Sequence, residues 1–223
     1  MEHSYTKMKI INFINEKIKN PFNPQYSYFM AEDKIHFTER DLFIKYLLDK
    51  EKEILKKYPP GIDGYTNLGS NSLTSRFIHY NLLNFTETAF LKEYIKDVHD
   101  RFLKLLKLEP EKNYYVQCWF NVMRKGEQIQ KHQHARSNNY YLSGHICVNV
   151  EKTNTYYESP YYKEPFASLN EIGKVTLFPS WLPHWTDKVE NDFKRITIAF
   201  DIRTEEAHNN NTVIELKDHW VKI

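Results

Sequence analysis

The stretch that decides the fold reads Trp119-Phe-Asn-Val-Met-Arg-Lys-Gly-Glu-Gln-Ile-Gln-Lys-His-Gln-His134. It begins inside an apolar run with the pattern of a β-strand, from residue 115 to residue 123, and Lys125-Gly126 then turns the chain. It ends on two histidines that are separated by one residue. Alternate residues of a strand point to the same face, so both imidazoles can reach one metal ion.

A second stretch, Phe178-Pro-Ser-Trp-Leu-Pro-His184, leaves another apolar run and supplies a third histidine. Non-haem iron oxygenases hold their metal with three side chains on one face of an octahedral ion and leave the opposite face open. We therefore predict a metal site that is built from His132, His134 and His184.

The identity of the third ligand is open at this point. Most iron sites of this kind use two histidines and one carboxylate, whereas here the motif carries His134. A carboxylate from Asp187 or Asp201 is the alternative ligand, and three imidazoles also suit zinc. A His-x-His pair alone is usually a surface or capping feature, so the metal hypothesis depends on the residues that follow His184.

Arg195 opens a strand-like run that ends at Phe200. The even-numbered apolar residues of this run share one face, and Arg195, Thr197 and Ala199 share the other. A guanidinium gives a carboxylate two parallel charge-assisted hydrogen bonds, and the Thr197 hydroxyl adds a further donor. The alternative is an edge-strand arginine paired on the surface with an acid from residues 187–192. Together with the histidines, the pattern favours a site for an organic acid.

The part of the chain after residue 110 has the period of β-strands. Besides residues 115–123, strands are predicted over residues 140–150, 174–178 and 196–202, and the tail from Val213 to Ile223 could form an edge strand. Several strands that follow a helical half indicate an α+β chain whose sheet is a barrel or a jelly roll.

The part before residue 110 contains two helical patterns. Thr38 and Asn84 each open a capping-box pattern, and apolar residues at helical spacing follow each of them. Between the two helices we predict a long loop, rich in Gly and Pro, and a short strand from Phe77 to Leu83. The expected organisation is a single domain over residues 1–223, in which a mainly helical and loop part (1–110) packs on a β core (111–223).

Composition limits the functions to consider. Lys and Arg number 31 and Asp and Glu 29, a net charge of +2 that gives no reason to expect an obligatory nucleic-acid partner. The sequence contains no run of about 18 apolar residues, so no membrane span is predicted. The first residues lack the apolar core of a signal peptide. Cys118 and Cys147 lie in apolar strand-like runs, so we expect buried free thiols in a cytoplasmic protein.

The segment 115–202 resembles the Fe(II)/2-oxoglutarate-dependent oxygenase superfamily, whose fold is a double-stranded β-helix of the jelly-roll or cupin-like type. It is most similar to a branch of hydroxylases that is common in bacteria and phages. The residues that carry the resemblance are Trp119, Asn121, Val122, Gly126, His132, His134, Ser143, Gly144, Phe178-Pro-Ser-Trp181, His184 and Arg195. The resemblance covers less than half of the chain, and nothing before about residue 110 takes part in it.

The resemblance implies a role for each candidate residue. The first and third histidines match the two ligand histidines of the superfamily, and His134 stands where most members have a carboxylate. Arg195 and Thr197 match the pair that holds the far carboxylate of 2-oxoglutarate. Asn121 matches an asparagine that binds the cosubstrate in some members.

The implied function is an Fe(II)- and 2-oxoglutarate-dependent dioxygenase that consumes O2 and releases succinate and CO2. Our prediction for the substrate is an amino-acid side chain, free or in a peptide, that becomes hydroxylated, with no membrane as partner. The loop from Tyr65 to Arg76 and the tyrosines of residues 156–162 are candidates for the substrate rim or for the surface of a homodimer.

Two other classes of function remain open. A cupin-like metal enzyme that does not use 2-oxoglutarate is favoured by the three histidines. A non-catalytic jelly-roll binding module is disfavoured by Arg195 and Thr197, because such a module has no need of that pair.

Overall fold

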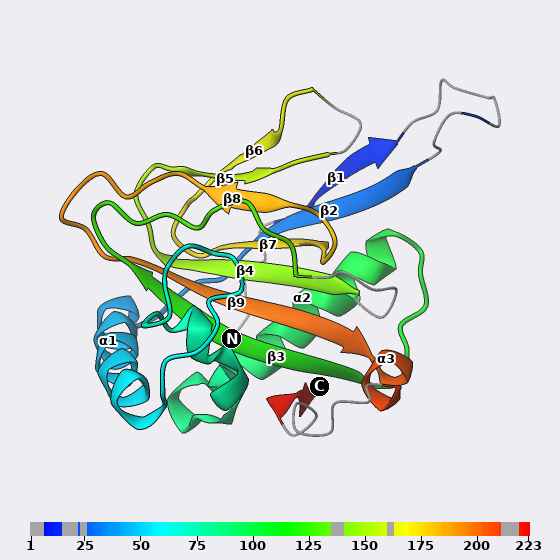
Figure 1. Ribbon diagram of the computed structural model, residues 1–223. Coiled ribbons are helices and arrows are strands. Elements are labelled where there is room, and N and C mark those ends of the chain that lie inside the picture. Colours follow the sequence, from blue (N-terminus) through cyan, green and yellow to red (C-terminus); the bar gives the residue numbers. More distant parts are fainter. Residues whose placement is uncertain (1–6, 15–21, 23–25, 135–140, 160–162, 211–218) are drawn as a thin grey trace.

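The computed structural model describes residues 7–14, 22, 26–134, 141–159, 163–210 and 219–223 (Figure 1). In chain order, the helices and strands are β1 (Lys9–Ile14), β2 (Ser27–Lys34), α1 (Arg40–Lys57), the 3-10 helices η1 (Thr74–His79), η2 (Leu82–Asn84) and η3 (Thr86–Thr88), α2 (Phe90–Leu105), β3 (Tyr114–Met123), β4 (Leu142–Asn149), β5 (Asn154–Tyr157), β6 (Phe166–Leu169), β7 (Lys174–Pro179), β8 (His184–Thr186), β9 (Arg195–Thr204), α3 (Glu205–Asn209) and β10 (Val221–Lys222). None of the helices in this part of the chain has the length and apolar character that crossing a membrane requires.

Two antiparallel sheets form the centre of the protein (Figure 1). The larger sheet has seven strands in the order β1-β2-β7-β4-β9-β3-β10, and the smaller has three in the order β6-β5-β8. Helix α2 runs along one face of the larger sheet, and the smaller sheet lies on the other side. Paired antiparallel sheets with helices on the outside confirm the expected α+β class, a double-stranded β-helix flanked by helices from the N-terminal half.

Alternate side chains of β3 and β9 point to opposite faces of the larger sheet, one facing the apolar core and the other a pocket. Phe120 and Phe200 are fully buried, and they belong to the same apolar cluster as Ile95 of α2. The odd-numbered residues Thr197 and Ala199 lie on the opposite face, where they line a pocket together with residues of the smaller sheet. The even-and-odd division of residues 195–200 that the sequence predicts is therefore confirmed.

The larger sheet also takes strands from before residue 111. Strand β1 pairs with β2, and β2 pairs with β7. β2 ends in charged residues that obscure a strand pattern, and tertiary ion pairs offset them: Glu32 lies 2.7 Å from Lys174, and Asp33 lies 2.5 Å from Arg101. The sheet is therefore not confined to residues 111–223, and residues 1–110 contribute more than helices and loops.

The strand predicted from Phe77 to Leu83 is wrong, because η1 and η2 occupy this segment. Buried Arg76 donates hydrogen bonds to the carbonyl oxygens of Tyr58 (3.0 Å), Ser70 (3.1 Å) and Ser72 (2.9 Å). These bonds fold the preceding loop back onto η1. Hydrogen bonds from the Arg76 side chain to carbonyl groups elsewhere in the chain leave no periodic pattern in the sequence, so the 3-10 helices could not be predicted.

The other predicted elements are present with small differences. Both helices are confirmed, but α1 begins at Arg40 and its N-cap Glu39 makes no side-chain capping bond, so the capping box at Thr38 is wrong. The four predicted strands correspond to β3, β4, β7 and β9. At the C-terminal end, β10 is an edge strand against β3, while residues 213–218 of the predicted tail lie outside the described residues. Both cysteines are buried free thiols, as expected.

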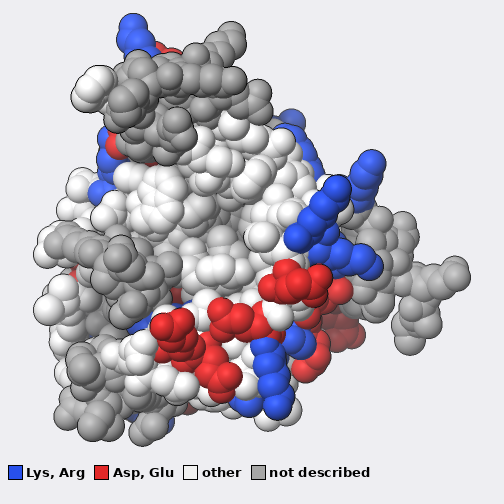
Figure 2. Space-filling view, turned by 90° about the vertical axis from the view of Figure 1, so that its right-hand side faces the viewer, with Lys and Arg blue, Asp and Glu red and all other residues white. Residues whose placement is uncertain are grey.

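Charged side chains of both signs lie close together on the surface. On the face shown in Figure 2, acidic side chains gather in the lower part and basic side chains border them on more than one side. This face therefore presents no uniformly basic surface of the kind that phosphate backbones attract.

Gly144 on β4 is a position where the packing excludes a side chain. A Cβ atom there would lie 2.4 Å from Cζ of Phe200 and 2.9 Å from the carbonyl oxygen of Thr176. We expect Gly144→Ala to lower the free energy of unfolding in urea by about 1–3 kcal/mol, because the ring and the strand must shift. The cost should shrink when the substitution is made in a Phe200→Leu background, and an equal cost in both backgrounds would contradict this explanation.

Candidate active site

The three histidines come from two segments that the main chain joins directly. The amide of His132 donates to the carbonyl of His184 (3.1 Å), and the amide of His184 donates back to the carbonyl of His132 (2.9 Å). The amide of His134 donates to the carbonyl of Ser180 (3.0 Å). The segment after β3 is thereby fixed against the start of β8, which brings the predicted ligands together as the sequence analysis required.

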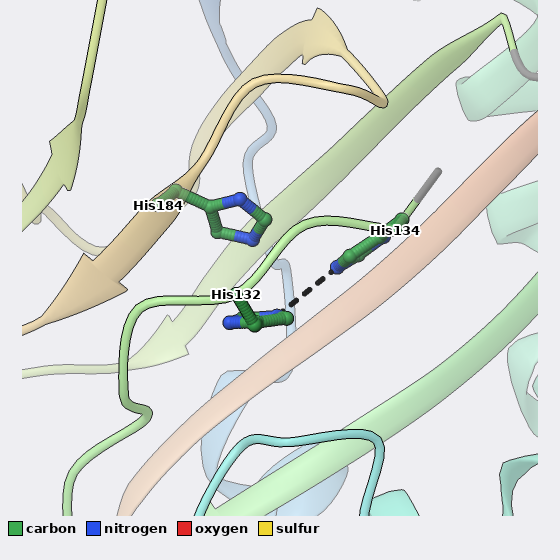
Figure 3. A group of neighbouring side chains, drawn as sticks. All are labelled: His132, His134 and His184. Carbon is green, nitrogen blue, oxygen red and sulfur yellow. Dashed lines mark hydrogen bonds between the residues drawn. The ribbon is translucent and has the colours of Figure 1, made fainter. Parts of the chain in front are cut away.

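The three imidazoles point toward one another (Figure 3). One nitrogen from each of His132, His134 and His184 lies within 4.8 Å of the other two, the spacing of a group that could hold a metal ion. The Nε2 atoms of His132 and His134 are 3.3 Å apart.

The second nitrogen of each ring is occupied by an oxygen acceptor. Nδ1 of His132 lies 2.8 Å from the carbonyl oxygen of Gln130, and Nδ1 of His184 lies 3.0 Å from that of Leu182. A carbonyl can only accept, so these rings carry their proton on Nδ1 and direct the Nε2 lone pair inward. This is how metal-binding histidines are oriented in proteins, and the donor set fits a divalent transition metal.

Burial keeps the rings in the form that binds metal. Burial, followed by the charge of His134, lowers the pKa of His132 to about 4. Burial, followed by the charge of His132, lowers the pKa of His184 well below its usual range. Both imidazoles are therefore neutral at physiological pH, and neutral imidazole is the ligand form.

Asp201 lies behind His134 and is not one of the converging groups. Its Oδ1 atom is 2.6 Å from Nδ1 of His134 and accepts a second hydrogen bond, also 2.6 Å, from Ser143. The other candidate carboxylate, Asp187, accepts from the backbone amide of Asn154 at 2.6 Å. Neither carboxylate joins the group of nitrogens, so the geometry favours three histidine ligands, with Asp201 orienting the second of them.

Arg195 is a buried cation that makes few polar contacts with the described residues. It is 2% exposed, and Nη2 lies 3.4 Å from the Thr155 hydroxyl, while Nε and Nη1 have no hydrogen-bond partner among the described residues. Burial lowers its pKa from the usual value. The surface pairing with an acid of residues 187–192 is absent, and an unpaired buried charge is costly unless a ligand neutralises it.

Arg195 and the histidines line one pocket of about 50 Å³. Thr197 and Asn121, the other predicted residues, also line this pocket and lie opposite each other on β9 and β3. The hydroxyl of Thr74 donates to the side-chain oxygen of Asn121. All six predicted site residues are therefore brought together.

Thr155 and His145 are among the residues of this pocket that were not predicted. Thr155 reaches it from β5 of the smaller sheet, and His145 reaches it from β4. The contact of Thr155 with the pocket depends on how the two sheets face each other, which the spacing of residues does not encode. His145 had a detectable signal, since it follows Ser143-Gly144 on a predicted strand, but its direction was ambiguous.

A second, larger pocket of about 450 Å³ also borders His132 and His134. Its walls include Tyr65, Phe77, Trp119, Gln117, Arg203 and Trp220. The loop from Tyr65 to Arg76 contributes to this pocket, as proposed for a substrate rim. Tyr156 instead stacks on Trp185 with ring centroids 5.4 Å apart, and residues 160–162 lie outside the described residues.

The position of Asp201 makes a test of the metal site possible. We expect Asp201→Asn to weaken binding of a divalent metal such as Co(II) by about 10–100-fold, because His134 loses the carboxylate that orients it. Competition with a chelating indicator measures this affinity. Asp187→Asn is the matched control, and an equal effect of both substitutions would contradict the role given to Asp201.

Comparison with known proteins agrees with this geometry. Residues 117–201 match a family model described as "Putative 2OG-Fe(II) oxygenase". No curated protein matches the chain.

Several solved structures share the fold. A prolyl-4-hydroxylase from Pseudomonas putida is 12% identical, with 79% of this chain and 92% of that chain covered and a TM-score of 0.50. HygX from Streptomyces hygroscopicus, solved with nickel and 2-oxoglutarate bound, is 9% identical over 79% of this chain and 82% of that chain, with a TM-score of 0.52. The α-ketoglutarate-dependent carbocyclase SnoK from nogalamycin biosynthesis is 10% identical over 78% and 79%, with a TM-score of 0.53.

At these identities the likeness is one of fold. The family match covers residues 117–201, which carry the histidines and Arg195, and this segment is similar to the 2OG-Fe(II) oxygenases, a family that uses Fe(II), 2-oxoglutarate and O2.

Proposed function

We propose that this protein is a 2-oxoglutarate-dependent dioxygenase that hydroxylates an amino-acid side chain, free or in a peptide, with release of succinate and CO2. The observation that carries the proposal is the guanidinium of Arg195, which is buried and forms no ion pair with any described residue, in the same pocket as three inward-facing imidazole nitrogens. The histidine nitrogens at one end of that pocket suit a metal cation, and Arg195 at the other end suits an anion. A 2-oxo diacid can bind the metal with one end and Arg195 with the other.

Each side chain has a defined task in this proposal. His132, His134 and His184 would hold Fe(II), which supplies the oxidising chemistry when 2-oxoglutarate and O2 are bound. Arg195 binds and orients the far carboxylate of the cosubstrate. Thr197 adds a hydroxyl donor beside it on the same face of β9.

Other groups position the cosubstrate and exclude water. Asn121 is held in place by Thr74 on the wall of the pocket. Thr155 supports Arg195 from the smaller sheet. Phe178 packs against His184 with ring centroids 4.7 Å apart and keeps that side of the site apolar.

The second pocket supports an amino-acid side chain as the substrate. It reaches His132 and His134 from the side away from Arg195, and its aromatic walls can enclose an apolar chain. Gln117 and Arg203 add polar groups of the kind that recognise amide or carboxylate groups. Substrate and cosubstrate would thus approach the metal from different sides. A cytoplasmic location and a homodimer are also part of the proposal, and the buried free thiols favour the first.

The cosubstrate is tested first. Addition of Fe(II) and then 2-oxoglutarate without oxygen should produce the weak visible charge-transfer band of the chelate. We expect Arg195→Gln to require about 100-fold more 2-oxoglutarate, because a bidentate charge-assisted pair is lost. His184→Ala should abolish the band, and Arg40→Gln, on the distant helix α1, should leave it unchanged. Tight zinc binding without a band would instead favour the cupin-like alternative.

The substrate is tested separately. With air admitted, succinate release should rise above its background rate when a free amino acid or a peptide from a panel is added, and the product should gain one oxygen atom by mass. Stimulation only by compounds that are not amino acids or peptides would contradict the substrate class and leave the dioxygenase proposal intact.

A further inference from the structure

Two buried ring nitrogens beside the metal site are candidates to contact a ligand. His145 on β4 and Trp119 on β3 both line the pocket that Arg195 and the three histidines share. Nε2 of His145 and Nε1 of Trp119 are buried, and neither has a hydrogen-bond partner among the described residues. A buried N–H group without an acceptor destabilises the protein unless a ligand supplies one.

The register of the larger sheet places His145 and Trp119 at the same position along the strand direction. His145 and Trp119 both lie opposite Ala199, one on each side of β9. The small side chain of Ala199 leaves space between them. Along the same face of β9, Asp201 is the next residue in one direction, and Arg195 lies farther away in the other. The two donors therefore lie near the histidine end of the pocket.

Ring contacts agree with this placement. The ring centroid of Trp119 is 5.6 Å from that of His134. The ring of Phe178 is near both His134 and His145, with its centroid 6.3 Å from each of theirs. The donors thus flank the place where a cosubstrate would meet the metal.

Tyr157 determines what His145 offers to a ligand. The Tyr157 oxygen lies 3.3 Å from Nδ1 of His145. We assign the phenol hydroxyl as the donor in this contact, which places the proton of the ring on Nε2. Burial, followed by the charge of Arg195, lowers the pKa of His145 to about 3, so the ring is neutral. His145 therefore presents one neutral N–H group, as the indole of Trp119 does.

We propose that His145 and Trp119 form a second carboxylate subsite, which binds the 2-oxo acid end of the cosubstrate while Arg195 binds the far carboxylate. This inference rests on the proposed function and adds to it a means of selecting 2-oxo diacids. A carboxylate has enough lone pairs to accept from both donors. A ligand without that carboxylate leaves both N–H groups unpaired and is rejected.

The experiment compares two ligands that differ only at this end. 2-Oxoglutarate carries the second carboxylate, and 4-oxopentanoate has a methyl group in its place. Calorimetric titration of the Fe(II)-loaded protein without oxygen measures the binding of each ligand, independently of turnover. We expect His145→Phe and Trp119→Phe each to weaken 2-oxoglutarate at least about tenfold and to leave 4-oxopentanoate unchanged.

Control variants separate the hydrogen bond from the shape of the pocket. His145→Gln keeps an N–H group near the position of Nε2 and should restore most of the affinity for 2-oxoglutarate. Arg195→Gln should weaken both ligands, since both keep the far carboxylate. Trp181→Phe, at a partly exposed position outside the pocket, should change neither.

Two results would overturn the subsite. Unchanged 2-oxoglutarate binding in both phenylalanine variants would show that the donors do not contact the ligand. Equal weakening of both ligands would show that the residues act through packing alone. Failure of the unsubstituted protein to bind 2-oxoglutarate at all would be a different outcome, because it would remove the proposed function itself.

Discussion

A pair of main-chain hydrogen bonds between His132 and His184 sets the geometry on which the site depends. The two residues lie on segments far apart in the sequence, and one of them opens β8 of the smaller sheet. Because backbone atoms make both bonds, the separation of the two main-chain segments does not depend on side-chain rotamers. The Nδ1 contacts of the two rings with the carbonyl groups of Gln130 and Leu182 then fix the imidazoles. The smaller sheet is thereby held to the segment after β3, and the pocket between the two sheets keeps its shape.

Charge balance supports the proposed site, in which no carboxylate binds the metal. Three histidine ligands would leave the full charge of a divalent metal in place, and Arg195 adds another positive charge to the pocket. Asp201 contributes one negative charge from behind His134, and a 2-oxo diacid contributes two. Metal, arginine, aspartate and dianion together are neutral. The negative charge that most related sites place on the metal is thus moved one hydrogen bond outward.

The sequence predicted the chemistry better than it predicted the surroundings. His-x-His and the arginine strand are local patterns, since a period of two residues puts each set on one face, and they pointed to four of the six residues that the structure places around one pocket. His184 and Asn121 were proposed from the segment that ends at His184 and from the family resemblance. Strand β2 was missed because charged residues at its end interrupt the alternation and find their partners only in the tertiary structure. Thr155 was missed for a related reason, because it reaches Arg195 across the gap between two sheets. His145 belonged to a recognised strand, yet only the structure shows which way it faces.

The loop from Tyr65 to Arg76, which lines the larger pocket, bears on how the proposed substrate preference could change in evolution. Arg76 anchors this loop through main-chain carbonyl groups, and Tyr65 and Asn67 adopt left-handed backbone conformations. Because these hydrogen bonds are made to main-chain atoms, they do not depend on which side chains the loop carries. Mutations in the loop can therefore change what the pocket accepts while the histidines and Arg195 stay as they are. In evolutionary terms, the proposed function would let this loop and the residues that hold the metal and the cosubstrate change at different rates.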